Sequence, residues 1–156
     1  MNLLILSCGT RDKVVQYFRK TFEGEGRIIC TDCSPYAPAL YEADAHYIVP
    51  RITEPGYLEV IYEICRKESI TGVLSLIDPE LSLIAAHKEQ FAALGVTVIG
   101  SEYALCERTL NKWELYCWMK EHKYPCVKTY VSLEEFRRAL DQGEIAFPVF
   151  VKPMKG

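Results

Sequence analysis

The most specific chemical signal in this sequence is a lysine near the end of the chain. Residues 147–151 have the length and apolar composition of a short strand, and Lys152 stands at its exit, followed shortly by Gly156. A strand that delivers an ammonium group into a glycine-bearing turn is a common way to hold a phosphate, because glycine lets backbone N–H groups approach the anion. The pattern therefore predicts a phosphate contact for Lys152. The alternative is an edge strand that ends in a solvated lysine.

A second lysine, Lys112, stands at the start of a predicted helix over residues 112–122. Asn111 is a suitable N-cap, and Glu114 three residues later completes a capping box. A cation in the first turn is mildly unfavourable against the helix dipole, which favours a functional reason for Lys112 over a purely solvated one.

Two acidic residues, Asp78 and Glu80, follow a predicted strand over residues 72–77. The run Asp-Pro-Glu is a strong helix start, with an Asx cap, a proline in the first turn and an acid near the positive end of the dipole. This position is the carboxyl edge of the sheet, where open α/β folds bind ligands. Asp78 and Glu80 are therefore possible substrate-side residues, and the alternative is that they only cap the helix.

The elements that must position these residues alternate along the first hundred residues. Continuous apolar runs predict buried strands, and the segments between them carry apolar residues at helical spacing. Repeated strand–helix–strand units argue for an α/β fold, a Rossmann-like parallel sheet with helices on both faces. We assign it to residues 1–101, with strands over residues 3–6, 27–30, 46–49, 72–77 and 96–99, and one helix from Asp78 to about Leu94.

The alternation changes after Ser101. Two helices follow each other over residues 102–108 and 112–122, and the apolar residues of the second nearly surround its axis, which predicts burial or a position between domains. A strand is predicted over residues 126–131, and a helix capped by Ser132 is predicted to end near Asp141. Residues 102–156 are thus interpreted as linker helices plus the first, incomplete part of another domain.

This order of elements resembles the front of an ATP-grasp ligase. Within that superfamily the chain is most similar to carbamoyl-phosphate-synthase-like and carboxylate–amine-ligase-like proteins, and residues 1–101 match their pre-ATP-grasp domain. The matches cover the whole chain, although 156 residues correspond only to the N-terminal part of such an enzyme. They lie in Thr31–Asp44, Val49–Pro50, Ile77–Leu81, Ile99–Ser101, Asn111–Lys112 and the strand before Lys152.

The resemblance implies a function for the parent enzyme. Lys112 and Lys152 match the two lysines that contact the ATP phosphates, although Asn111 stands where the family commonly has an acid. The parent would use ATP and Mg²⁺ to activate a small-molecule carboxylate as an acyl phosphate, which an amine substrate then attacks. We expect this chain alone to be inactive and to hold no cofactor, as a truncated chain or a fragment whose intramolecular partner is the missing C-terminal ATP-grasp portion.

Two other interpretations remain open. A stand-alone Rossmann-like domain could bind a nucleotide or small molecule, because Asp32 stands near the position of a ribose-binding acid, but Gly9 alone is not a dinucleotide fingerprint. Cys30 and Cys33 form a C-x-x-C pair, yet no second pair at metal-ligand spacing exists, so structural thiols are favoured over a metal or redox site.

Composition limits the remaining classes. The formal net charge is −3, which does not favour nucleic acid or an anionic membrane as a partner. The sequence has no window of about 20 apolar residues for a membrane span. It also shows no basic leader of the kind that directs secretion, so we expect a cytoplasmic protein.

Overall fold

The computed structural model describes residues 1–155, which form two compact units. The first unit is Met1–Tyr103, and the second begins at Ala104. Gly156, the glycine of the predicted phosphate-binding turn, lies outside the described residues.

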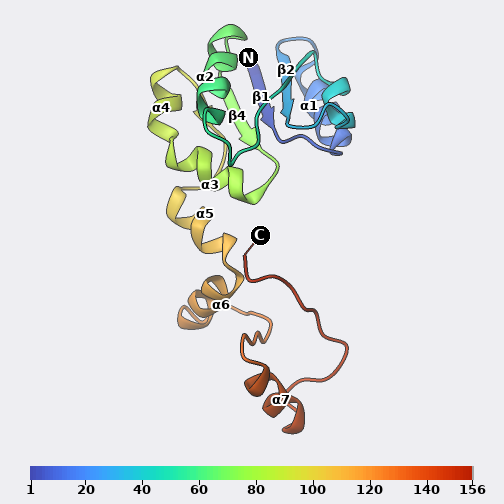
Figure 1. The fold of residues 1–156 in the computed structure, drawn as a ribbon, viewed down its shortest axis with the longest axis vertical. Coiled ribbons are helices and arrows are strands. Elements are labelled where there is room, and N and C mark those ends of the chain that lie inside the picture. Colours follow the sequence, from blue (N-terminus) through green and yellow to red (C-terminus); the bar gives the residue numbers. More distant parts are fainter. Residues whose placement is uncertain (156) are drawn as a thin grey trace. The chain divides into compact units, whose positions relative to one another are not determined.

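The first unit is built on a sheet of five parallel strands in the order β3-β2-β1-β4-β5 (Figure 1). Leu3 of the central strand pairs with Ile28 on one side and Gly72 on the other. The predicted α/β, Rossmann-like fold is confirmed. The strands are β1 Asn2–Leu6, β2 Arg27–Asp32, β3 Ala45–Ile48, β4 Gly72–Ser75 and β5 Thr97–Val98.

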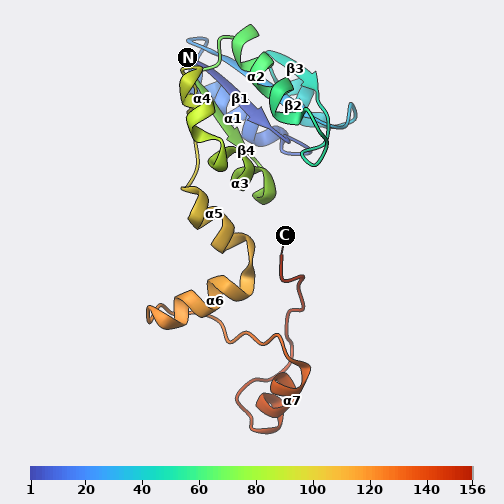
Figure 2. The same cartoon turned by 60° about the vertical axis from the view of Figure 1, so that its left-hand side comes forward.

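Helices cover both faces of this sheet, as predicted (Figures 1 and 2). Alternate side chains of β1 point to opposite faces, so Leu4 packs with one layer of helices and Ile5 with the other. The Leu4 face carries α2 Tyr57–Lys67, α3 Asp78–Ala86 and α4 Lys88–Ala93; the Ile5 face carries α1 Asp12–Phe22 and the short 3-10 helix η1 Pro38–Glu42.

The prediction of a single helix from Asp78 to about Leu94 is wrong in one respect, because the structure has two helices there. The predicted helix divides at His87, whose backbone N–H bonds the carbonyl of Ile84 at 3.2 Å and so tightens the last turn of α3. The His87 ring also contacts the Leu83 carbonyl at 2.9 Å. α4 then restarts in a new direction and places Phe91 in the core.

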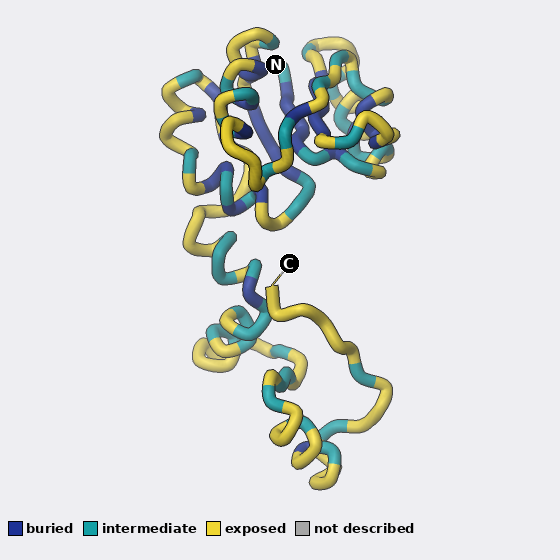
Figure 3. Tube along the Cα trace, in the orientation of Figure 1, coloured by how far each residue is buried: buried dark blue, intermediate teal, exposed yellow. Residues whose placement is uncertain are grey.

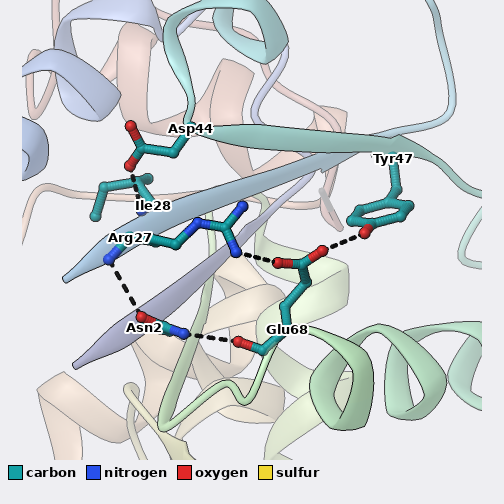
Figure 4. Close-up of polar contacts among 6 residues, drawn as sticks. All are labelled: Asn2, Arg27, Ile28, Asp44, Tyr47 and Glu68. Carbon is teal, nitrogen blue, oxygen red and sulfur yellow. Dashed lines mark hydrogen bonds and ion pairs between the residues drawn. The ribbon is translucent and has the colours of Figure 1, made fainter.

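The amino edge of the sheet is closed by a polar network that the sequence analysis did not identify (Figure 4). Glu68 directly follows α2, and its carboxylate forms an ion pair at 2.6 Å with the Arg27 guanidinium of β2. The Tyr47 hydroxyl of β3 donates to the other carboxylate oxygen. Asn2 of β1 donates to the Glu68 carbonyl at 2.7 Å and accepts the Arg27 backbone N–H at 3.2 Å. Three strands and a helix end are thus tied together around one residue, Glu68, through its carboxylate and its backbone carbonyl.

Replacement of this carboxylate by an amide is expected to destabilise the first unit. The Tyr47 hydrogen bond and the Arg27 charge lower the pKa of Glu68. Because the folded state then binds fewer protons than the unfolded chain, the stabilisation is present above the ordinary glutamate value of about 4.3 and is lost as the pH falls below it. Glu68→Gln should cost about 1.5–3 kcal/mol at neutral pH, the range for hydrogen bonds to charged groups.

Urea unfolding at several pH values would measure this effect. The cost of Glu68→Gln should shrink as the pH falls through the titration of the carboxylate. Glu63→Gln is the matched control, because Glu63 is exposed on α2, the helix that ends just before Glu68. Equal pH dependence in the two variants would contradict the assigned role of Glu68.

The second unit contains α6 Lys112–Glu121 and α7 Leu133–Asp141, while α5 Tyr103–Leu110 begins at the last residue of the first unit. Both predicted caps are confirmed. The Asn111 side chain accepts the N–H groups of Trp113 and Glu114, and the Ser132 hydroxyl accepts that of Glu135.

Two predicted strands, over residues 126–131 and 147–151, are not formed. Val127 is 85% exposed and Phe150 is 94% exposed, so neither segment has a layer to pack against. An isolated strand pair is marginal without a third strand or a covering helix, which explains the failure of both predictions.

Of the two environments predicted for the helix over residues 112–122, burial is not found within the described chain, because α6 has no buried residue. A position between domains stays a prediction. Of the described residues after Ala104, only Asn111 and Ala139 are buried, whereas β1, β2 and β4 of the first unit are buried almost throughout (Figure 3). Across residues 1–155, no helix combines the length and apolarity needed to cross a membrane.

Candidate functional site

The carboxyl edge of the first unit brings together the turns that follow β1, β2 and β4. Parallel strands end at one edge, so Ser7, Cys33 and Asp78, far apart in the sequence, all belong to this edge. The edge therefore collects the acidic and thiol groups that the sequence analysis singled out. Their environments differ sharply.

Glu80 points into the protein rather than toward a ligand. It is fully buried; one carboxylate oxygen accepts the Tyr57 hydroxyl and the other accepts the Ser75 hydroxyl at 2.5 Å. Burial raises the pKa of Glu80, although these hydrogen bonds oppose the shift. Burial and the nearby Glu80 carboxyl also raise the pKa of Tyr57. Glu80 does not offer a free carboxylate to substrate, and its possible substrate-side role can only be indirect.

Asp78 has the opposite environment. It is exposed, and its side chain makes no hydrogen bond or ion pair with another of the described residues. The predicted Asx cap is wrong, because the helix begins at Asp78 itself with Ile77 in the N-cap position and no side-chain cap. Of the two possible substrate-side residues, Asp78 is the one whose carboxylate is open to a ligand.

Asp32 holds the first turn together. Its two carboxylate oxygens accept the backbone N–H groups of Gly9 and Ser34, each at 2.9 Å. Gly9 has a φ of 54°, in the left-handed region that glycine adopts without a steric penalty. A carboxylate engaged by two backbone donors has less capacity for ribose hydroxyls, so this geometry does not favour the dinucleotide interpretation.

The two cysteines of the C-x-x-C pair diverge. Cys30 is buried and Cys33 is exposed. Cys30 instead shares a hydrogen bond with Cys8, which lies in the turn after the neighbouring strand β1, and this bond, together with burial, raises the pKa of Cys30. Within residues 1–155, no three His, Cys, Asp or Glu side chains gather closely enough to hold a metal ion.

In the second unit, the segment after Lys152 returns to the start of α6. The Lys112 backbone N–H donates to the Met154 carbonyl at 2.9 Å, and Asn111 and Lys155 form an antiparallel bridge. This pairing brings the segments that carry the two predicted phosphate-binding lysines together, and no sequence pattern pointed to it. The Lys152 side chain is exposed, with its Nζ 5.9 Å from the centre of the Phe150 ring.

The second unit also has a hollow of about 390 Å³ between α6 and α7, which contains neither Lys112 nor Lys152. It was not predicted, because the residues concerned carry no motif. Aromatic and charged side chains share its wall, among them Trp113, Tyr116, Tyr130, Glu135 and Arg138.

The sequence of the first unit decides the family. Residues 3–99, well over half of the chain, match the family described as PylC-like, N-terminal domain. The chain belongs to the PylC-like N-terminal domain family. By sequence, no curated protein matches it.

Solved structures similar to this PylC-like chain are ATP-grasp enzymes, so the predicted resemblance to the N-terminal part of that superfamily is confirmed at the level of the fold. L-amino acid ligase from Bacillus licheniformis is 16% identical with a TM-score of 0.64, and 99% of this chain covers 37% of it. N5-carboxyaminoimidazole ribonucleotide synthetase from Thermotoga maritima is 18% identical with a TM-score of 0.61, and 99% of this chain covers 39% of it.

A third similar structure, the N5-carboxyaminoimidazole synthetase from Staphylococcus aureus complexed with ADP, is 12% identical with a TM-score of 0.64. Here 99% of the PylC-like chain covers 39% of the synthetase. The chain thus spans well under half of the length of these solved enzymes.

Proposed function

We propose that this PylC-like chain is the N-terminal part of an ATP-dependent ligase that joins a small-molecule carboxylate to an amine. The observation that carries the proposal is the combination of the family match over residues 3–99 with a fold shared by ATP-grasp ligases over 99% of the chain. In the proposed reaction the carboxylate is activated as an acyl phosphate, and the amine then displaces the phosphate. The protein would act in the cytoplasm.

The residues of the second unit suit a contact with the ATP phosphates. Two ammonium groups on separate elements can neutralise a polyphosphate. The hydrogen bond between the Lys112 N–H and the Met154 carbonyl joins the segment that carries Lys112 to the segment that follows Lys152. Lys152 is exposed and so accessible to an anion. Bound ATP would supply the phosphoryl group; these residues would bind and orient it.

The described residues offer no comparable fit for Mg²⁺. Hard cations need several oxygen ligands, and no suitable group of acidic side chains occurs within residues 1–155. We therefore assign no metal-binding role to this part of the chain and place the proposed Mg²⁺ ligands in the remainder of the parent enzyme.

The remainder of the ATP-grasp domain is the intramolecular partner we propose for the second unit. Phe147 is 70% exposed, Phe150 94% and Val151 91%, a run of apolar surface that would gain from burial. Added strands from a longer chain would give residues 147–151 the sheet that they lack here.

Calorimetry with Mg·ATP tests this function. The chain of 156 residues should bind weakly or not at all, whereas a chain extended to the length of the solved ligases should bind with ordinary enzyme affinity. Tight nucleotide binding by the shorter chain would overturn the proposal and support a stand-alone nucleotide-binding domain.

A further inference from the structure

Glu80 stands beneath the turns that leave two neighbouring strands. Ser75, the last residue of β4, donates to its carboxylate, and Ser7, which follows β1, also hydrogen-bonds to it. Tyr57 at the start of α2 completes the set. One fully buried carboxyl group therefore contacts three elements that meet at the carboxyl edge of the sheet.

The turn above Glu80 has a backbone that needs support. Ser7 has a φ of 45°, a left-handed conformation that costs free energy for a residue other than glycine. Asp32 secures the far side of this turn through Gly9, so the Glu80 contact secures the near side.

The turn that follows β4 is also hydrogen-bonded to the Glu80 carboxyl group. The Ser75 hydroxyl donates to Glu80 and accepts the backbone N–H of Ile77 at 3.1 Å. Ile77 directly precedes Asp78, the exposed acid of this edge. Two hydrogen bonds thus connect the Glu80 carboxyl to the residue that precedes Asp78.

The surroundings of Glu80 are polar and uncharged on most sides. The hydroxyls of Ser7, Tyr57 and Ser75 face it, the Asp32 carboxylate lies near it, and Cys33 lies near Tyr57. A buried carboxyl that takes hydroxyl donors from three elements fixes their relative positions, because a lost partner leaves a buried polar group unsatisfied.

We propose that Glu80 is a positioning residue that holds the turns after β1 and β4 in place and thereby sets the position of Asp78 on the ligand-facing edge. Its effect on substrate binding rests on the proposed ligase function, whereas its effect on the two turns does not. Glu80 touches no substrate itself.

Amide hydrogen exchange, followed by NMR on the chain of 156 residues, tests the proposal. The reporters are the N–H of Cys8, bonded to the Thr31 carbonyl at 3.1 Å, and the N–H of Ile77. The N–H of Leu4 within β1 serves as the reference for global unfolding. Glu80→Gln should accelerate exchange of the two reporters about tenfold more than that of the reference, the effect of one lost hydrogen bond.

The matched control is Glu89→Gln, which makes the same chemical change on the exposed face of α4 and should leave all three amides unchanged. Tyr57→Phe removes one donor from Glu80 and should accelerate the same two reporters by a smaller factor. It provides the test if Glu80→Gln does not fold. Unchanged reporters, or equal acceleration at reporters and reference, would mean that Glu80 does not position the turns.

The failure of the ligase function is a separate outcome. In the extended chain, Glu80→Gln should raise the KM for the carboxylate substrate more than the KM for ATP. If local acceleration is found but the extended wild-type chain does not bind ATP, the positioning role stands and the proposed ligase is wrong.

Discussion

Replacement of Lys152 by alanine is expected to lower kcat/KM of the extended ligase about hundredfold, the order of magnitude found when a charge-stabilising donor is removed from an active site. Lys152 presents an exposed ammonium group next to the segment that pairs with the start of α6. A polyphosphate needs cations on more than one side, and few neutral residues can substitute for them. Lys112→Ala should have an effect of the same kind.

The measurement is steady-state kinetics together with calorimetric titration of ATP. Lys128→Ala is the control, because it removes the same charge from an exposed ion pair with Glu144, which is worth little in water. Lys152→Ala and Lys112→Ala should each lose ATP affinity. Each should still unfold at the same denaturant concentration as the wild type. Wild-type ATP affinity in Lys152→Ala would remove Lys152 from the phosphate site.

Replacement of Phe91 by alanine is expected to cost the first unit about 3–5 kcal/mol of unfolding free energy. Phe91 is fully buried, and its ring meets the Tyr62 ring edge-on with centroids 4.9 Å apart. Its carbonyl also accepts the backbone N–H of Val96, at the entry to β5. The cavity left by the substitution would open where α2, α4 and the sheet meet.

Chemical unfolding followed by far-UV circular dichroism measures this loss, which is a large fraction of the stability of a typical domain. Tyr17→Ala is the control, since Tyr17 is 66% exposed on α1 and its loss should change stability by less than about 0.5 kcal/mol. A cost below that of the Tyr17 control would show that α4 does not contribute to the core as described.

Local signals in the sequence were sufficient for most of the first unit. Continuous apolar runs such as Leu3–Leu6 predicted central strands, because only a strand buried on both faces tolerates apolar residues without alternation. The caps of α6 and α7 were also predictable, because Asn111 and Ser132 bond backbone groups only two or three residues away.

The candidate site was predicted less completely. The sequence placed Asp78 and Glu80 at one edge of the sheet but treated them alike, because both follow the same strand. Glu80 is buried and Asp78 exposed because Glu80 bonds Tyr57 and Ser75, and the sequence gives no sign of these contacts. The capping role expected of Asp78 failed for a different, local reason, since the helix begins one residue earlier than the motif suggested.

The strands predicted at residues 126–131 and 147–151 show the limit most clearly. Both segments carry the apolar and β-branched residues typical of strands, although the second includes Pro148, yet a strand exists only where another strand completes its hydrogen bonds. The sequence by itself therefore determined the α/β fold and the family resemblance, and it indicated the two lysines that we propose to contact phosphate. Tertiary structure alone decided which acid is buried, which is exposed and where the segment after Lys152 pairs, because each depends on distant partners rather than on neighbouring residues.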